Sequence, residues 1–309
     1  MEEQKRWCIF TSAGDNNAIR LWLLGDVPRR WDLIVAYYGD NDQEFAEINK
    51  MSSNAFRAKG GKFQNLKKLM VQSPRRLDQY SHVWVCDDDI RMSAAQINDA
   101  FAIAEFFKFW VAQPSFLQEG KISHLITRYA GPQCDYRIVN FIEENVPIFS
   151  RVKLIEFLTA YDGSLTGWGI DYWYLNLFGA NKLGRITSLF GKSGMGRFAI
   201  IDRVTVINPQ DEEKGGRELD RLQPLPLRLA AWREAKAKYG LVEFQPKIFA
   251  SCKISSRKGE AAVTRLDVVR ETAIRLARKL ARLTRNIGVS KGFRRRTAAG
   301  IEIVERDSN

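Results

Sequence analysis

The stretch His82-Val83-Trp84-Val85-Cys86-Asp87-Asp88-Asp89-Ile90 joins a short apolar run to three consecutive carboxylates. An apolar run without polar alternation is typical of a strand that is covered on both faces of a sheet. The three aspartates then follow the carboxyl end of that strand, where open α/β sheets bind their ligands. Because adjacent carboxylates repel one another, we predict a divalent-metal site at Asp87–Asp89. The alternative is a solvated acidic turn after an edge strand, but this strand is too apolar for an edge.

The segments before this strand predict a β-α-β opening. Arg6–Thr11 and Trp31–Tyr38 have the composition of strands, and Ala18–Leu24 between them has apolar residues at helical spacing. Strands that alternate with helices predict an α/β fold around a mostly parallel mixed sheet.

Two glycine-containing loops of this opening are candidates for the binding of a nucleotide. Gly14 and Asp15 lie in a small polar loop after the first predicted strand, although that loop lacks the GxGxxG spacing. Lys62 follows a glycine pair at the start of a predicted helix, where backbone amides and an ammonium group can approach a phosphate. The alternative for Lys62 is the solvated face of an amphipathic helix, and the sequence does not decide between the two.

The middle of the chain predicts a long helix and several short strands. Ser93 is a good N-cap for a helix that extends to about Val111 and ends at Gln113-Pro114-Ser115. Strands are predicted at Ile122–Thr127, Asn140–Ile142 and Leu241–Phe244.

Two acidic positions in this region are candidates for catalysis. Glu143 and Glu144 directly follow a predicted strand and are either catalytic or an ordinary surface pair. In Gly167-Trp168-Gly169-Ile170-Asp171, Trp168 suits stacking on a sugar ring and Asp171 can act as a base. The alternative is a helix start in which Asp171 is a cap and Trp168 belongs to the core.

Composition restricts the class of protein. The 309 residues are 45% hydrophobic and 27% charged, as in globular proteins. The four cysteines have no CxxC spacing and are typical of free thiols in a reducing compartment. No apolar run reaches the roughly 20 residues that span a bilayer, and the charged start is unlike a signal peptide, so we expect a cytoplasmic protein.

The net charge of +12 is concentrated near the C-terminus. The segment 264–296 holds eleven basic residues against two acidic ones, which accounts for nine of the twelve charges. Its leucines recur at helical spacing, so we predict two parts, a catalytic domain at 1–250 and a basic amphipathic helical tail at 251–309. We expect the tail to lie on an anionic membrane surface, with a helix packed on the body or a short coiled coil as alternatives. Nucleic acid is a weaker candidate because no recognition module accompanies the arginines.

The motifs together resemble a known family. Val83–Asp89 is similar to the DxD-bearing strand of GT-A nucleotide-sugar glycosyltransferases. With the other motifs in order, the chain resembles the domain of unknown function 707 family from about Trp7 to Pro209. The motifs that carry this resemblance are Lys59-Gly60-Gly61-Lys62-Phe63, Thr127-Arg128, Asn140-Phe141-Ile142-Glu143, Pro147-Ile148-Phe149-Ser150, Gly167-Trp168-Gly169-Ile170-Asp171 and Ala199-Ile200-Ile201-Asp202.

The resemblance implies a metal-dependent glycosyltransferase and a role for each candidate residue. Asp87 and Asp89 would hold Mn²⁺ or Mg²⁺ against the diphosphate of a nucleotide-sugar donor, with a UDP-sugar favoured. Asp88 and the loop residues named above would face the donor. Trp168 would face the sugars, and Asp171 would deprotonate the hydroxyl of a glycan or lipid-linked acceptor for one inverting displacement. Glu143 and Glu144 are the rival bases.

One departure from the family pattern concerns the metal. Where a late histidine ligand is expected, this chain has Asn208, whose carbonyl oxygen suits Mg²⁺ better than softer metals. The departure favours, as an alternative, a catalytically inactive GT-A-like module that binds a membrane or RNA through the tail. Metal-dependent phosphoryl transfer or hydrolysis is a third candidate.

Overall fold

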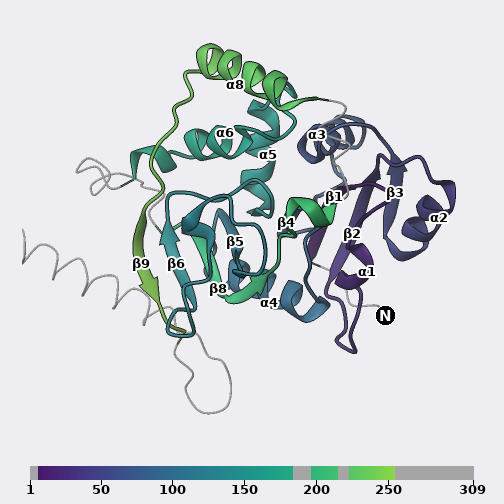
Figure 1. Cartoon of the computed structure of the whole chain (residues 1–309), viewed down its shortest axis with the longest axis horizontal. Coiled ribbons are helices and arrows are strands. Elements are labelled where there is room, and N and C mark those ends of the chain that lie inside the picture. The colour runs from purple at the N-terminus through teal and green to yellow at the C-terminus, as the bar shows by residue number, and fades with distance from the viewer. Residues whose placement is uncertain (1–5, 184–195, 215–222, 255–309) are drawn as a thin grey trace, which may run out of the picture. The chain divides into compact units, whose positions relative to one another are not determined.

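A nine-stranded mixed sheet crosses the described part of the chain, in the order β3-β2-β1-β4-β7-β5-β8-β6-β9 (Figure 1). The structure is a computed structural model that describes residues 6–183, 196–214 and 223–254. Its strands are β1 (Trp7–Ala13), β2 (Trp31–Tyr37), β3 (Asn54–Arg57), β4 (His82–Asp87), β5 (Val111–Phe116), β6 (Tyr136–Val139), β7 (Ile148–Ser150), β8 (Phe198–Val206) and β9 (Ile248–Cys252).

The four strands β3, β2, β1 and β4 are parallel neighbours. Trp7 in β1 is in register with both Trp31 of β2 and His82 of β4, and all seven residues of β1 are buried. Burial on both faces explains the unbroken apolar runs in these strands. The three predicted strands are therefore confirmed, whereas β3 is an additional, partly exposed edge strand that lacks such a run.

The other half of the sheet mixes directions. β7 is antiparallel to both β4 and β5, while β8 is parallel to β5 and antiparallel to β6. The longest pairings, β1 with β2 and β1 with β4, are parallel. The predicted α/β class with a mostly parallel mixed sheet is confirmed.

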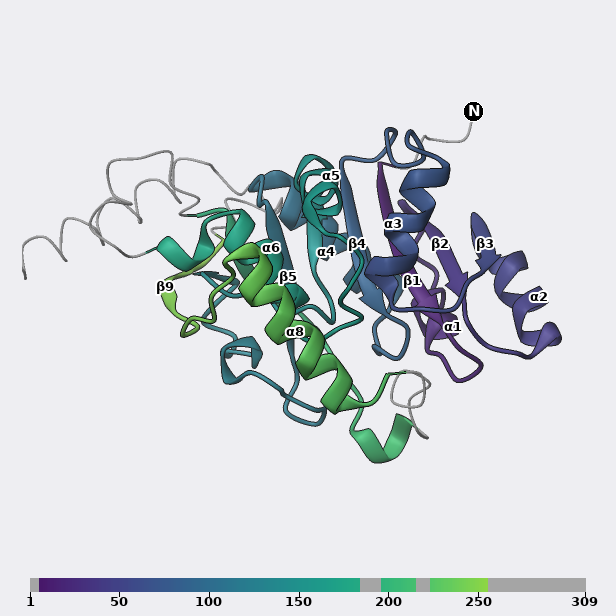
Figure 2. The ribbon, with the colours of Figure 1, turned by 90° about the horizontal axis from the view of Figure 1, so that it is seen from above.

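Helices cover both faces of the sheet (Figure 2). One face packs against α3, α5, α6 and α8 in a single hydrophobic core that includes Phe63, Phe157, Tyr174 and Trp232. The other face packs against α4, whose Phe101 contacts the rings of Trp7 and Trp84. The helices are α1 (Ile19–Trp22), α2 (Asp42–Met51), α3 (Lys62–Gln72), α4 (Ala94–Phe106), α5 (Arg151–Ala160), α6 (Ile170–Leu177) and α8 (Leu225–Tyr239), with the short turns η1 (Leu125–Thr127), η2 (Ala180–Lys182) and η4 (Asp211–Lys214).

The helix predicted after Ser93 is shorter than expected. Ser93 does cap α4 by accepting from the Gln96 amide, but α4 ends at Phe106. Val111–Phe116, assigned from sequence to the end of this helix, is instead the buried central strand β5. Pro114 is tolerated there because the pairing of β5 with β8 shifts register directly after it.

Three predicted short strands are wrong. Within Ile122–Thr127 the chain forms the turn η1, Asn140–Ile142 is an irregular segment after β6, and Leu241–Phe244 is irregular as well. Brief apolar runs alone do not identify a strand, and two of these segments even leave apolar side chains exposed, Leu125 and Val242.

The basic tail lies outside the described residues from 255 onward, so its helix and its membrane contact stay predictions. Among the described residues, no helix has the length and apolar character needed to cross a bilayer.

Candidate active site

The acidic turn begins where β4 ends and lies beside the end of β1. Ser12 is in register with Asp87, so the loop after β1 faces the second aspartate of the turn. The Gly14 amide donates to Asp88 Oδ2 at 2.9 Å. Burial, followed by repulsion from Asp89, raises the pKa of Asp88 to about 8. Gly14 and Asp88, both predicted to face the donor, are therefore in contact, and the turn is anchored to the loop after β1.

Lys62 is a buried cation between two carboxylates. Its side chain is 6% exposed, and its Nζ donates to Asp87 Oδ1 and, at 2.8 Å, to Glu144 Oε2. Burial lowers the pKa of Lys62, but attraction to Asp87 and Glu144 outweighs this and raises it above its ordinary value. The solvated alternative for Lys62 is thereby excluded, and a fixed positive charge stands beside the acidic turn.

A close backbone approach positions Lys62. Gly61 precedes α3, and a Cβ built on Gly61 would lie 2.5 Å from the carbonyl oxygen of Thr166. Only glycine permits this contact. It brings the start of α3 against the segment that leads into Gly167–Asp171.

A second acidic cluster consists of Glu143, Glu144 and Asp171. Asp171 lies in the first turn of α6 and is 7% exposed, and burial, followed by repulsion from Glu144, raises its pKa to about 7. Glu143 is 3% exposed, and burial, followed by repulsion from Asp171, raises its pKa to about 8. The structure thus brings together all three acidic residues predicted to be catalytic, and the pKa is raised further in Glu143 than in Asp171.

The two acidic groups are held together by backbone contacts. The Asp87 amide donates to the Asn145 carbonyl at 2.8 Å, and Asn145 Nδ2 donates to Glu143 Oε1 at 3.0 Å. The 143–145 turn therefore lies against the end of β4, with Lys62 between the clusters. Such a site can offer a cation-binding turn and a separate group for proton transfer.

A short antiparallel bridge places Asn208 beside Ile90, the residue that follows Asp89. Arg91 pairs with Ile207, with the Arg91 amide donating to the Ile207 carbonyl at 2.9 Å, so Asn208 lies next to the end of the acidic turn in register. Asn208 is 2% exposed. Carboxylate and amide oxygens fit a hard divalent cation that takes its other ligands from a diphosphate and water. Within residues 6–183, 196–214 and 223–254, no group of three or more His, Cys, Asp or Glu side chains is arranged to hold a metal by itself.

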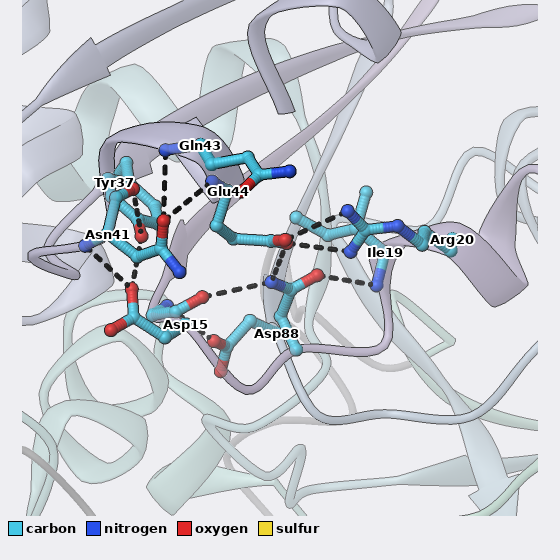
Figure 3. Close-up of polar contacts among 10 residues, drawn as sticks. Asp15, Ile19, Arg20, Tyr37, Asn41, Gln43, Glu44 and Asp88 are labelled. Atoms are coloured by element: carbon cyan, nitrogen blue, oxygen red, sulfur yellow. Dashed lines mark hydrogen bonds and ion pairs between the residues drawn. The ribbon is translucent and has the colours of Figure 1, made fainter. Parts of the chain in front are cut away.

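The loop after β1 is stabilised mainly by the end of β2 (Figure 3). Asp15 accepts from the Tyr37 hydroxyl and from the Asn41 amide at 3.4 Å, and the Tyr37 bond contributes most to lowering the pKa of Asp15. Asn17 bridges the Gly14 carbonyl at 2.9 Å and Glu44 at 3.0 Å. The sequence indicated Gly14 and Asp15 but missed Asn17, Tyr37 and Glu44, because their contacts join loops far apart in the chain.

Trp168 and Gly169 form the wall next to Asp171. Trp168 is 51% exposed, as a sugar-stacking residue requires, so its assignment to the core is excluded. Gly169 has φ +89°, and a Cβ there would lie 2.4 Å from the ring of Trp232 on α8. Trp232, which the sequence did not indicate, thereby packs directly under the start of α6.

His124 lies at the edge of this region. Its ring contacts Phe141 at a centroid distance of 4.5 Å, and burial lowers its pKa. His82 starts β4 at the opposite end of the strand from the acidic turn. His124 packs on an aromatic ring and His82 is distant from the turn, as expected for structural histidines.

Replacement of Gly169 by alanine tests the packing of this wall. We expect Gly169→Ala to lower the free energy of unfolding by about 2 kcal/mol, because the methyl group meets Trp232 and the residue has a left-handed conformation. Gly179→Ala is the matched control, since Gly179 has φ +76° but nothing lies within 4 Å of the position that a Cβ would take, and it should lose only about 1 kcal/mol. Urea denaturation measures both. Equal losses of unfolding free energy in the two variants would show that the Trp232 ring moves aside without destabilising the protein.

No family model matches the sequence, and no curated protein matches it either. The resemblance to the domain of unknown function 707 family therefore stays a prediction.

Solved structures to which this chain is similar include S. aureus TarS and GalNAc-T7. S. aureus TarS is 9% identical, with a TM-score of 0.47 over 68% of this chain and 38% of TarS. The TarS 1-349 fragment in complex with UDP is 10% identical, with a TM-score of 0.44 over 66% of this chain and 60% of the fragment. GalNAc-T7 with UDP, GalNAc and Mn²⁺ is 10% identical, with a TM-score of 0.49 over 76% of this chain and 49% of that one. This chain thus spans less than two thirds of each, and likenesses at this level support no conclusion about substrate or mechanism.

Proposed function

We propose that the protein is a nucleotide-sugar-dependent glycosyltransferase with its active site at the carboxyl end of β4. The observation that carries the proposal is the buried Lys62, which joins the acidic turn at Asp87 to the second acidic cluster at Glu144. A donor diphosphate requires positive charge, which a metal ion at the acidic turn would supply, and an acceptor hydroxyl requires a base, which the second acidic cluster would supply. Lys62 contacts both groups, so they are close enough to act on one pair of substrates.

The donor side of the proposed site uses the acidic turn. Asp89 and Asn208 would hold Mn²⁺ or Mg²⁺, with Asp87 fixed by Lys62. The bound ion would supply Lewis-acid stabilisation of the diphosphate as it leaves. Asp88, anchored by the Gly14 amide, shapes the loop that faces the nucleotide, for which a UDP-sugar is our preferred donor.

The acceptor side uses the start of α6. Trp168 offers an exposed aromatic face to a sugar ring, and Asp171 lies three residues further along in the first helical turn. With a pKa of about 7, Asp171 is both substantially ionised at neutral pH and basic enough to take a proton. Deprotonation of an acceptor hydroxyl by Asp171, followed by one in-line displacement at the donor carbon, would invert the sugar. A glycan or a lipid-linked acceptor fits this open aromatic wall.

Titration calorimetry with UDP, with and without Mn²⁺ or Mg²⁺, tests the donor site. We expect binding that strengthens with the metal and weakens at least tenfold in Asp89→Ala, whereas Asp99→Ala, an exposed carboxylate on α4, should bind as the parent does. A thermal-shift screen of nucleotide sugars then identifies the donor, because only ligands that bind the folded state raise the melting temperature.

Turnover distinguishes the remaining functions. A glycosyltransferase releases UDP from the donor at a rate that rises with the acceptor, while a hydrolase does so without one. Metal-dependent UDP binding without any turnover would identify an inactive binding module. Absence of UDP-sugar binding under all these conditions would contradict the proposal.

A further inference from the structure

A hollow of about 420 Å³ lies at the opposite end of the sheet from the acidic turn. Its wall includes His82, the first residue of β4, together with Arg6 and Arg197, which precede β1 and β8. The acidic turn begins at Asp87, about 16 Å away along β4. The hollow is therefore separate from the candidate active site.

The charge around the hollow is positive. Arg6 pairs with Glu105 at 2.8 Å, and the second oxygen of that carboxylate accepts from Trp7 Nε1 at 3.3 Å. Glu105 is thus fully engaged, and no carboxylate in the described part of the chain pairs with Lys108 or Arg197. Burial lowers the pKa of His82 to about 4, so this residue is neutral at pH 7. The positive charge at the hollow therefore comes from Arg6, Lys108 and Arg197.

Lys108 occupies an unusual backbone position. Its φ of +55° makes it the one residue other than glycine with a positive φ in the described ranges. It follows Phe107, the C-cap of α4, and here the Lys108 amide donates to the Glu105 carbonyl and the Phe109 amide to the Ala104 carbonyl, both at 3.1 Å. Glycine is favoured at such a helix end, so lysine carries a conformational cost here.

Arg197 is oriented by the same turn. Its Nη1 donates to the Lys108 carbonyl at 3.1 Å, which holds the guanidinium of Arg197 beside the ammonium-bearing residue. The Trp110 amide donates to the Arg197 carbonyl at 2.7 Å, so the two segments are joined from both sides. The Arg197 guanidinium and the exposed side chain of Lys108 thus line the same hollow, and two such cations suit an anion with several acceptor oxygens.

We propose that this hollow is a second binding site, for a small phosphorylated molecule whose phosphate contacts Lys108 and Arg197. A phosphate group matches the neighbouring guanidinium and ammonium donors, and Arg6 lies on the same wall. The volume exceeds that of a phosphate ion and falls in the range of small-molecule sites, with Trp110 and Phe109 as an apolar wall for the rest of the ligand. This inference does not depend on the proposed glycosyltransferase activity.

The test is titration calorimetry on the full chain with inorganic phosphate and with glucose 1-phosphate, each in the absence and presence of saturating UDP. We expect binding that persists with UDP and that is tighter for glucose 1-phosphate than for phosphate. Lys108→Gly, Lys108→Ala and Arg197→Gln should each raise the Kd at least tenfold.

The glycine and alanine variants separate charge from folding. Both remove the ammonium group, but only glycine relieves the left-handed backbone, so Lys108→Gly should melt about 2 °C above Lys108→Ala. Equal loss of binding by a more stable and a less stable variant excludes unfolding as its cause. Arg233→Ala, which removes an exposed cation on α8, should bind as the parent does.

Three results would overturn the proposal. The first is no binding of either ligand at millimolar concentration. The second is binding that UDP abolishes and Lys108→Gly leaves unchanged, which would place the phosphate at the candidate active site. The third is an equal loss in Arg233→Ala, which would show a general effect of net charge. If UDP itself does not bind, the Kd of the Lys108 variants for glucose 1-phosphate still tests whether the ligand lies in this hollow.

Discussion

We expect Asp171→Asn to lower kcat about a thousandfold with the donor that the thermal-shift screen identifies. The substitution keeps the size of the side chain but removes the base, and proton transfer by a positioned group contributes about 10²- to 10⁴-fold to a rate. The asparagine oxygen can still accept from the Tyr172 amide, which bonds Asp171 Oδ1 at 2.7 Å, so the helix start should be retained. Steady-state kinetics and the melting temperature together measure this variant.

The pH profile gives an independent readout of the same residue. Because the pKa of Asp171 is raised to about 7 and the base must be ionised, kcat/KM should fall about tenfold for each pH unit below 7. In Asp171→Asn this limb should vanish.

Glu143→Gln is the matched control for Asp171. The pKa of Glu143 is raised to about 8, so at pH 7 the side chain is mostly protonated and glutamine resembles it. We expect less than a tenfold loss of kcat at pH 7. A larger loss in Glu143→Gln than in Asp171→Asn would assign the base to Glu143.

Lys62→Met should lower the free energy of unfolding by about 4 kcal/mol at pH 7. Removal of one partner from a buried ion pair leaves the other charge uncompensated, and here both Asp87 and Glu144 lose their cation. Urea denaturation measures the loss.

Two comparisons show whether charge is the cause. Lys68→Met lies on the same helix but replaces an exposed lysine, and it should change stability by less than about 0.5 kcal/mol. Because the pKa of Lys62 is raised above its ordinary value, the parent should lose the stabilisation by the ion pairs only at alkaline pH, and the difference from Lys62→Met should shrink there. A difference that stays constant as the pH is raised through the pKa of Lys62 would indicate packing instead of charge.

The strand at His82–Asp87 and its acidic turn were predictable because the signal is local. A buried parallel strand must be apolar along its whole length, and the aspartates that follow it can only lie at the sheet edge. The sequence indicated the Gly14 loop only as a polar loop after a strand, and its contact with Asp88 arises because β1 and β4 are neighbours in the sheet.

The central strand β5 and the ion pairs of Lys62 were not predictable in this way. Pro114 indicates the end of an element, and only its place at a register shift with β8 makes it compatible with a strand. Lys62 contacts residues 25 and 82 positions away, so its burial depends on the packing of three separate segments. Trp232 was missed for the same reason, because its relation to Gly169 arises only when α8 packs on α6.

The strand order also has a consequence for the growing polypeptide on the ribosome. β1 to β4 can pair as soon as residues 7–87 have been synthesised, since each finds its neighbours among them. β5 and β6 flank β8, which ends only at Val206, so their half of the sheet cannot close until more than a hundred further residues have emerged. Domains fold from the N-terminus during synthesis at about 5–20 residues per second. The edges that meet β8 therefore stay unpaired for roughly 5 to 20 s in β5 and roughly 3 to 13 s in β6, an interval in which a nascent-chain chaperone would have its main opportunity to bind.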